Sequence, residues 1–224
     1  MRIANHRTIC VDDASNLEDD KNTALMKRIL LITLFILFIL SIFIYHYIDE
    51  KVTRLDLPKG EILWSIVKPK NAKMCIPAAF TGEDGKISGS YRYDGKTYQN
   101  GKALNMRVSL KDESFYISKN WMSDNGFQQL TLVYNSKPMK FRDSSKAIRR
   151  ALCKDENGAF ILQSNYPMTL DKFAIECSKH STNATYLDMG EYGYGYIKKN
   201  REIRHLYIWG FFTRNKQTNW IYIE

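Results

Sequence analysis

The chain has 224 residues, of which 44% are hydrophobic and 25% charged, and its net charge is +9. This length suits one compact domain with a buried core, but not comfortably two. The positive charge attracts polyanions, yet the basic residues are spread along the chain and no helix-turn-helix, RRM or zinc-finger pattern occurs, so nucleic acid is not an expected partner.

The first element in chain order is an apolar stretch, ILLITLFILFILSIFIYHYI, at residues 29–48. It contains no Asp, Glu, Lys or Arg, and as a helix it would reach roughly 30 Å, the thickness of a membrane core. A cleaved signal peptide is the alternative, but its apolar region is usually only about 7–15 residues long and is followed by small residues. We therefore expect an uncleaved single-pass anchor at residues 26–48.

The charges that flank this stretch predict its orientation. Lys27 and Arg28 precede it, whereas Asp49 and Glu50 follow it, and Lys and Arg mark the cytoplasmic side of a membrane span. Residues 1–25, which show no structural pattern, are expected to be a cytoplasmic tail. The remainder of the chain is then expected outside the cytoplasm, in a periplasmic or extracellular space.

A polar segment, residues 49–60, ends in the turn sequence LPKG and is predicted to be a linker, so that the domain spans residues 61–224. Residues 51–224 contain 28 Lys and Arg against 17 Asp and Glu, an excess of 11 positive charges. This excess favours an anionic glycan as partner, and a solvated basic surface beside a membrane is the alternative.

The first half of the domain is expected to be an antiparallel meander. Two Asp-Gly pairs, in TGEDGK and YDGK, are typical of tight turns between strands. The stretches rich in branched and aromatic residues lie at 74–80, 87–96, 105–110 and 128–139.

The pattern then changes to one strand, one helix and another strand. The apolar run GAFILQS at 158–164 predicts a strand buried on both faces, and 168–181 places Leu170, Phe173, Ala174 and Cys177 on one helical face. ATYL at 184–187 is the next strand, which gives a βαβ unit with two parallel strands. With two further strands in RHLYIWGFFT and TNWIYIE, the sequence predicts a mixed α/β (α+β) domain around one mixed sheet.

Asp188 directly follows the last strand of this unit. Ligands bind outside the carboxyl ends of such strands, which makes this acid a candidate site residue. An Asp at the end of a strand is also a common turn former, and that alternative stays open.

Three cysteines, Cys75, Cys153 and Cys177, fall in the outward part, so at most one disulfide can form there. Cys177 and His180 form a C-x-x-H pair, but no second pair lies at a zinc spacing, and Cys177 belongs to the apolar face of the helix. We expect neither a metal site nor a cofactor.

The order of these pieces resembles the phosphodiester glycosidase family over residues 74–223. The family's I-N-G-G-F-F strand and D-G-x-x-x-G turn correspond to IPAAFTGEDGKISG, and its R-T-A-I-G corresponds to RRALC. Its F-A helix and L-D-G-G-G-S strand end correspond to KFAIECSKHSTNATYLDMGEYG, and its closing P-N-A/W corresponds to TNWIYI. The resemblance implies hydrolysis of a sugar–phosphate bond, with Asp188 and Arg149 as catalytic residues.

Other residues near these motifs are candidates for substrate binding: Phe80, Asp84, Arg150, Gly190, Glu191 and Tyr192. Asp84 can instead only make its turn, Glu191 can be a solvated loop acid, and Arg150 would point away from Arg149 if this piece is a strand. Tyr192, Tyr194 and Tyr196 can pack against sugar rings or form an aromatic edge strand.

The sequence also departs from the family pattern. Pro77 replaces the Asn, Ala78 and Ala79 replace the glycines, and Met189 interrupts the glycine-serine loop after the acid. Glycines in such loops let a ligand approach the backbone closely, whereas side chains at these positions would narrow the pocket.

Phosphate leaves a sugar without being protonated, so one carboxylate and one cation can suffice where ordinary glycosidases need two carboxyl groups. Two functions are therefore expected: a membrane-anchored hydrolase-like domain acting on a glycosyl phosphodiester or related anionic glycan, or an inactive module on the same fold that binds such glycans.

Overall fold

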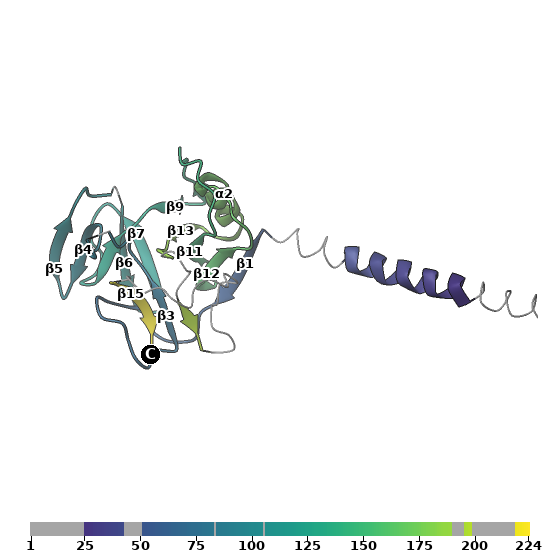
Figure 1. Ribbon diagram of the computed structural model, residues 1–224. Helices are drawn as coiled ribbons and strands as arrows, with labels where there is room; N and C mark the ends of the chain where they lie inside the picture. Colours follow the sequence, from purple (N-terminus) through teal and green to yellow (C-terminus); the bar gives the residue numbers. More distant parts are fainter. Residues whose placement is uncertain (1–24, 43–50, 83, 105, 190–194, 199–217) are drawn as a thin grey trace, which may run out of the picture. The chain divides into compact units, whose positions relative to one another are not determined.

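The computed structural model describes residues 25–42, 51–82, 84–104, 106–189, 195–198 and 218–224. The chain forms two compact units, Met1–Glu50 and Lys51–Glu224 (Figure 1). The unit boundary lies about ten residues earlier than the domain start expected from the sequence.

The described part of the first unit is the helix Leu25–Ile42, which has a mean hydropathy of 2.4. Its length and apolar composition allow it to cross a membrane, and a signal sequence near the N-terminus would have the same properties. Residues 43–48 of the expected span lie outside the described residues.

The second unit is built on a six-stranded sheet with the order β1-β12-β11-β13-β9-β10, in which every neighbouring pair is antiparallel. Strand β1 lies within the stretch that the sequence predicted to be a linker, and it pairs along its whole length with β12. The strands are β1 (Val52–Asp56), β12 (Gly158–Ser164), β11 (Arg150–Asp155), β13 (Asn183–Tyr186), β9 (Thr131–Tyr134) and β10 (Lys137–Pro138).

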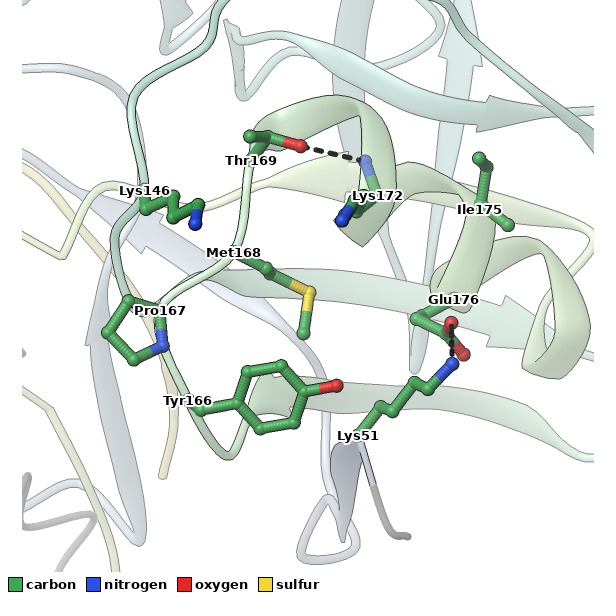
Figure 2. Close-up of a pocket in the computed structure, with 9 residues that line it drawn as sticks. All are labelled: Lys51, Lys146, Tyr166, Pro167, Met168, Thr169, Lys172, Ile175 and Glu176. Carbon is green, nitrogen blue, oxygen red and sulfur yellow. Dashed lines mark hydrogen bonds and ion pairs between the residues drawn. The ribbon is translucent and has the colours of Figure 1, made fainter. Parts of the chain in front are cut away.

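Helix α2 (Leu170–His180) lies within the predicted stretch, residues 168–181, and buries the predicted face. The Thr169 hydroxyl accepts a hydrogen bond from the Lys172 N–H (3.4 Å; Figure 2), and Asp171 and Lys179 lie in the first and last turns, where they oppose the helix dipole. The predicted apolar residues are buried against the sheet in one cluster with residues of β9, β11, β12 and β13.

The two strands that flank α2 are parallel, as predicted, but they are not neighbours in the sheet. β12 and β13 both pair with β11, which lies between them and is antiparallel to each. The two strands therefore run in the same direction without hydrogen bonding to each other, as in a split βαβ arrangement. Parallel strands do not pair anywhere in the described sheets, and the domain is richer in antiparallel sheet than a balanced α/β fold.

The region expected to be a meander forms two hairpins, β4–β5 and β6–β7, and strand β8 lies between them in the sheet. The five-stranded sheet has the order β5-β4-β8-β6-β7. The Asp94-Gly95 turn joins β4 to β5 with both residues at positive φ, as the sequence predicts for an Asp-Gly hairpin. The strands are β4 (Gly89–Tyr93), β5 (Lys96–Asn100), β6 (Arg107–Lys111), β7 (Ser114–Ser118) and β8 (Gly126–Gln128).

A four-stranded sheet has the order β14-β3-β15-β2 and carries the chain's closing segment. The predicted last strand is present as β15, whereas RHLYIWGFFT lies outside the described residues. The strands are β2 (Leu63–Ser65), β3 (Met74–Pro77), β14 (Tyr196–Ile197) and β15 (Trp220–Ile223).

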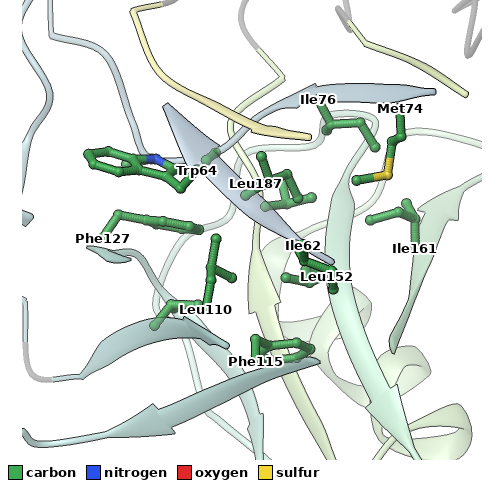
Figure 3. Packing of buried hydrophobic residues seen from close by; sticks show 14 of the residues in the cluster. Ile62, Trp64, Met74, Ile76, Leu110, Phe115, Phe127, Leu152, Ile161 and Leu187 are labelled. Atoms are coloured by element: carbon green, nitrogen blue, oxygen red, sulfur yellow. The ribbon is translucent and has the colours of Figure 1, made fainter. Parts of the chain in front are cut away.

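The main hydrophobic core contains buried residues from all three sheets (Figure 3). Ile161 and Leu152 of the six-stranded sheet belong to this core, whereas their neighbours Phe160 and Cys153 belong to the cluster under α2. Strands β11 and β12 are thus buried on both faces, as the apolar run at 158–164 predicts.

Candidate active site

Asp188 lies two residues beyond β13 and is buried, with 9% of its surface exposed. Its N–H donates to the carbonyl of Ala78 (2.9 Å), and its carboxylate oxygen Oδ2 accepts from the N–H of Thr81 (3.1 Å). The acid at the end of β13 is thereby tied to the segment that follows β3. A hydrogen bond from a backbone N–H favours the charged form of a carboxyl group.

That segment, residues 78–81, is held from its other side by Asn219. The Asn219 side chain is completely buried; its Oδ1 accepts from the N–H of Ala79 (2.7 Å), and its Nδ2 donates to the carbonyl of the same residue (3.0 Å). Its amide therefore pairs with Ala79 as a neighbouring strand would. The sequence motif TNW contains this residue, but reasoning from the sequence assigned it no role.

Tyr186, the last residue of β13, is the second site residue that the sequence reasoning missed. Its ring packs against Phe80 with 5.5 Å between centroids, and its hydroxyl accepts from Arg149 Nη1 (3.5 Å). Burial raises the pKa of this hydroxyl, and the negative charge of Asp188 adds to the increase. The hydrogen bond from Arg149 and the positive charge of Arg150 act in the opposite direction.

Arg149 immediately precedes β11, and protein groups surround its guanidinium. Nη2 donates to the carbonyl of Ser145 (3.0 Å) and to the carboxylate of Asp143 (3.2 Å), and Nε donates to the carbonyl of Met168 (3.3 Å). The guanidinium also lies 5.7 Å from the centre of the Tyr186 ring. Arg149 therefore holds the loop at residues 143–145 against the end of the sheet.

Arg150 has no exposed surface. Its Nε and Nη2 donate to Gln163 Oε1 (3.1 and 2.9 Å), and a Cβ built on Gly195 would lie only 3.1 Å from its Nη1. Burial lowers its pKa to about 10, and Tyr186 opposes this shift. Because successive strand residues point to opposite faces, the two arginines enter the domain on different sides of the sheet.

The remaining predicted residues divide into three groups. Phe80 contacts Tyr186 as described, whereas Asp84 is exposed and its Oδ1 accepts from the N–H of Lys86 (3.0 Å), which is the role of a turn acid. Gly190, Glu191 and Tyr192 lie outside the described residues.

A cavity of about 480 Å³ adjoins this site through a pair of threonines. The hydroxyl of Thr218, which lines the cavity, is 3.2 Å from the hydroxyl of Thr81. Tyr91 and Tyr98 stack with 5.0 Å between ring centroids and an interplanar angle of 13°. Other polar lining residues are Lys86, Gln99 and Asn100.

Cys75, Cys153 and Cys177 are buried free thiols, and burial raises the pKa of Cys75 to about 11. Nowhere in the described ranges do three His, Cys, Asp or Glu side chains come together as metal ligands.

No family model matches the chain, and no curated protein matches its sequence. Among solved structures, the zebrafish N-acetylglucosamine-1-phosphodiester alpha-N-acetylglucosaminidase catalytic domain, auto-inhibited by its pro-peptide, superimposes with a TM-score of 0.51 at 15% identity, over 77% of this chain and 72% of that one. The fold is similar to that of a phosphodiester glycosidase. At this identity the likeness concerns the fold.

Proposed function

We propose that residues 51–224 form a hydrolase-like domain that acts on a glycosyl phosphodiester or a related anionic glycan. The observation that carries the proposal is the group of charges at the end of β13, in a fold similar to that of a glycosidase. There the buried carboxylate of Asp188 lies two residues after Tyr186, whose hydroxyl accepts a hydrogen bond from the guanidinium of Arg149.

In the proposed mechanism, Asp188 stabilises the positive charge that develops on the sugar carbon or attacks that carbon directly. Arg149 binds oxygens of the departing phosphate, for which a planar guanidinium is well suited. An incoming phosphate would replace the carboxylate of Asp143, which is 41% exposed and bound to Nη2. The exchange substitutes one anion for another, so Arg149 is not left unpaired.

The neighbouring cavity supplies a place for the glycan. The flat faces of Tyr91 and Tyr98 can pack against sugar rings, and the side-chain amides of Gln99 and Asn100 can hydrogen-bond to hydroxyl groups. The Thr218–Thr81 contact joins the cavity to the segment that binds the Asp188 carboxylate.

A binding module without turnover is the second candidate, and Met189 favours it. The resemblance places a small residue after the acid, but Met189 follows Asp188 here and is buried, with 7% of its surface exposed. A long side chain at this position takes up space that a substrate would need.

The experiment that separates these candidates is a turnover screen. The full-length chain, in a neutral detergent, is incubated with sugar 1-phosphodiesters of a fluorescent alcohol. Cleavage at the sugar carbon releases the free sugar and the fluorescent phosphate monoester, which are separated and quantified, and binding of each diester is measured in parallel. Turnover supports the hydrolase, binding without turnover supports the second candidate, and the lack of both would refute the proposal.

A further inference from the structure

A second cavity of about 480 Å³ lies at the N-terminal end of α2 (Figure 2). Its cationic lining residues are Lys51, Lys146 and Lys172, and Tyr166 adds a hydroxyl. Segments far apart in the sequence supply these residues: the start of the second unit, the loop before β11, the loop after β12 and the first turn of α2.

The lysines are not equivalent. Glu176, the acid in the lining, forms ion pairs with Lys179 (2.8 Å) and Lys51 (3.5 Å). Within the described part of the chain, neither Lys146 nor Lys172 lies within ion-pair distance of a carboxylate. Figure 2 shows their side chains extending toward the same space beside Met168 and Thr169. The positive charge of the cavity is therefore concentrated between these two ammonium groups.

Two further features add positive charge to the cavity. The apolar lining consists of the buried side chain of Met168 and the exposed side chains of Pro167 and Ile175. The guanidinium of Arg149, bound to the carbonyl of Met168, adds positive charge behind this lining. The N-terminal end of the α2 dipole adds a smaller contribution of the same sign.

We propose that this cavity binds a phosphate group, carried either by a soluble phosphate ester or by a phospholipid headgroup. Lys146 and Lys172 bind the phosphate oxygens from two sides, and the hydroxyl of Tyr166 donates to a third oxygen. The lipid is a relevant source because only eight residues separate Lys51 from the end of the apolar helix in the sequence. This site is independent of the function proposed for Asp188.

The test is isothermal titration of the full-length chain in a neutral detergent with glycerol 3-phosphate. The wild type is expected to bind one equivalent saturably, and the double variant Lys146→Gln/Lys172→Gln is expected to bind about tenfold more weakly or worse, since two charge-assisted contacts are lost. The matched control, Lys96→Gln/Lys111→Gln, removes two exposed lysines on the five-stranded sheet and should bind as the wild type does. Asp188→Asn should also leave this binding unchanged, which separates the two sites.

Titration with dihexanoyl phosphatidylglycerol, against dihexanoyl phosphatidylcholine as a lipid without net charge, distinguishes the sources of phosphate. Tighter binding of the anionic lipid than of glycerol 3-phosphate assigns the cavity to headgroups, and the reverse order assigns it to soluble esters. Failure of the wild type to bind any of these phosphates saturably, or an equal loss in the control variant, would overturn the proposal.

Discussion

Asp188 is the residue whose charge the proposed chemistry requires. In Asp188→Asn the acceptor of the Thr81 N–H remains, because an amide oxygen can take the place of Oδ2. We therefore expect loss of turnover, or of glycan binding, with a melting temperature close to that of the wild type. Calorimetry and the turnover screen measure the two effects on the same sample. A large drop in melting temperature with glycan handling intact would instead identify Asp188 as a turn acid.

Asn219 has the opposite expectation, because its side chain satisfies buried backbone groups. Asn219→Ala leaves the N–H and carbonyl of Ala79 without their partner and creates a small cavity. The free energy of unfolding should fall by about 2–4 kcal/mol. Urea denaturation measures the change, and Asn120→Ala, at an exposed position, serves as the control. Equal stability of the two variants would contradict the role assigned to Asn219.

These residues also show how far sequence reasoning reaches. Asp188 could be identified because its place directly after a strand is a local property of the chain. Asn219 and Tyr186 could not, since their importance depends on contacts with residues 140 and 37 positions away. Arg149 was identified, but its contacts with the loop at residues 143–145 were not, because surface loops have no periodic pattern.

At the scale of elements, α2 was predicted to within a few residues because its cap, charges and apolar face are all encoded within about twelve positions. Thr169→Ala tests the cap, since it removes the acceptor of the Lys172 N–H. The expected loss is about 1 kcal/mol in the free energy of unfolding, measured in urea. Thr97→Ala, on the exposed strand β5, should change stability much less, and equal losses would show that the cap contributes nothing specific.

The ion pairs of Glu176, one with Lys51 at the start of the second unit and one with Lys179 in α2 itself, make stability depend on pH. Burial would raise the pKa of Glu176, but the hydrogen bonds and charges of Lys179 and Lys51 outweigh it, so the net pKa is lowered. A lowered pKa adds stability above the unfolded value of about 4.3, and this stability is lost as the pH falls through the folded value.

Glu176→Gln should therefore be less stable than the wild type at pH 7, by less than about 1 kcal/mol because both lysines are about half exposed. When urea denaturation is repeated, the difference should be nearly unchanged at pH 5 and should shrink near pH 3.5. Glu113→Gln, at an exposed turn, is the control. A difference that grows on acidification would reverse the sign of the linkage.

At the scale of the whole molecule, strand order was the least predictable property. The βαβ spacing correctly placed β12, α2 and β13 in sequence, yet β11 lies between the two strands and pairs with both. Likewise, β8 comes after the β6–β7 hairpin in the chain but inserts between β4 and β6. Hydrophobic patterns report which faces are buried, not which strands are neighbours, so these pairings were not accessible from periodicity.

The last prediction concerns the membrane. Lys27 and Arg28 on one side of the apolar stretch, and Asp49 and Glu50 on the other, favour a cytoplasmic N-terminus. Alkaline phosphatase fused after Glu224 should therefore be active, and a reporter that works only in the cytoplasm should be silent at the same position. The opposite result would reverse the topology.

The same fusion distinguishes an anchor from a cleaved signal sequence, which the helix Leu25–Ile42 alone does not. An uncleaved anchor keeps the protein in the membrane fraction after an alkaline carbonate wash, and its mass by intact mass spectrometry includes the apolar segment. A soluble, shortened product would show cleavage, and the domain would then reach its glycan by diffusion. Retention at the membrane would instead confine the domain to glycans near the bilayer, the setting in which a phospholipid headgroup can reach the cavity lined by Lys146 and Lys172.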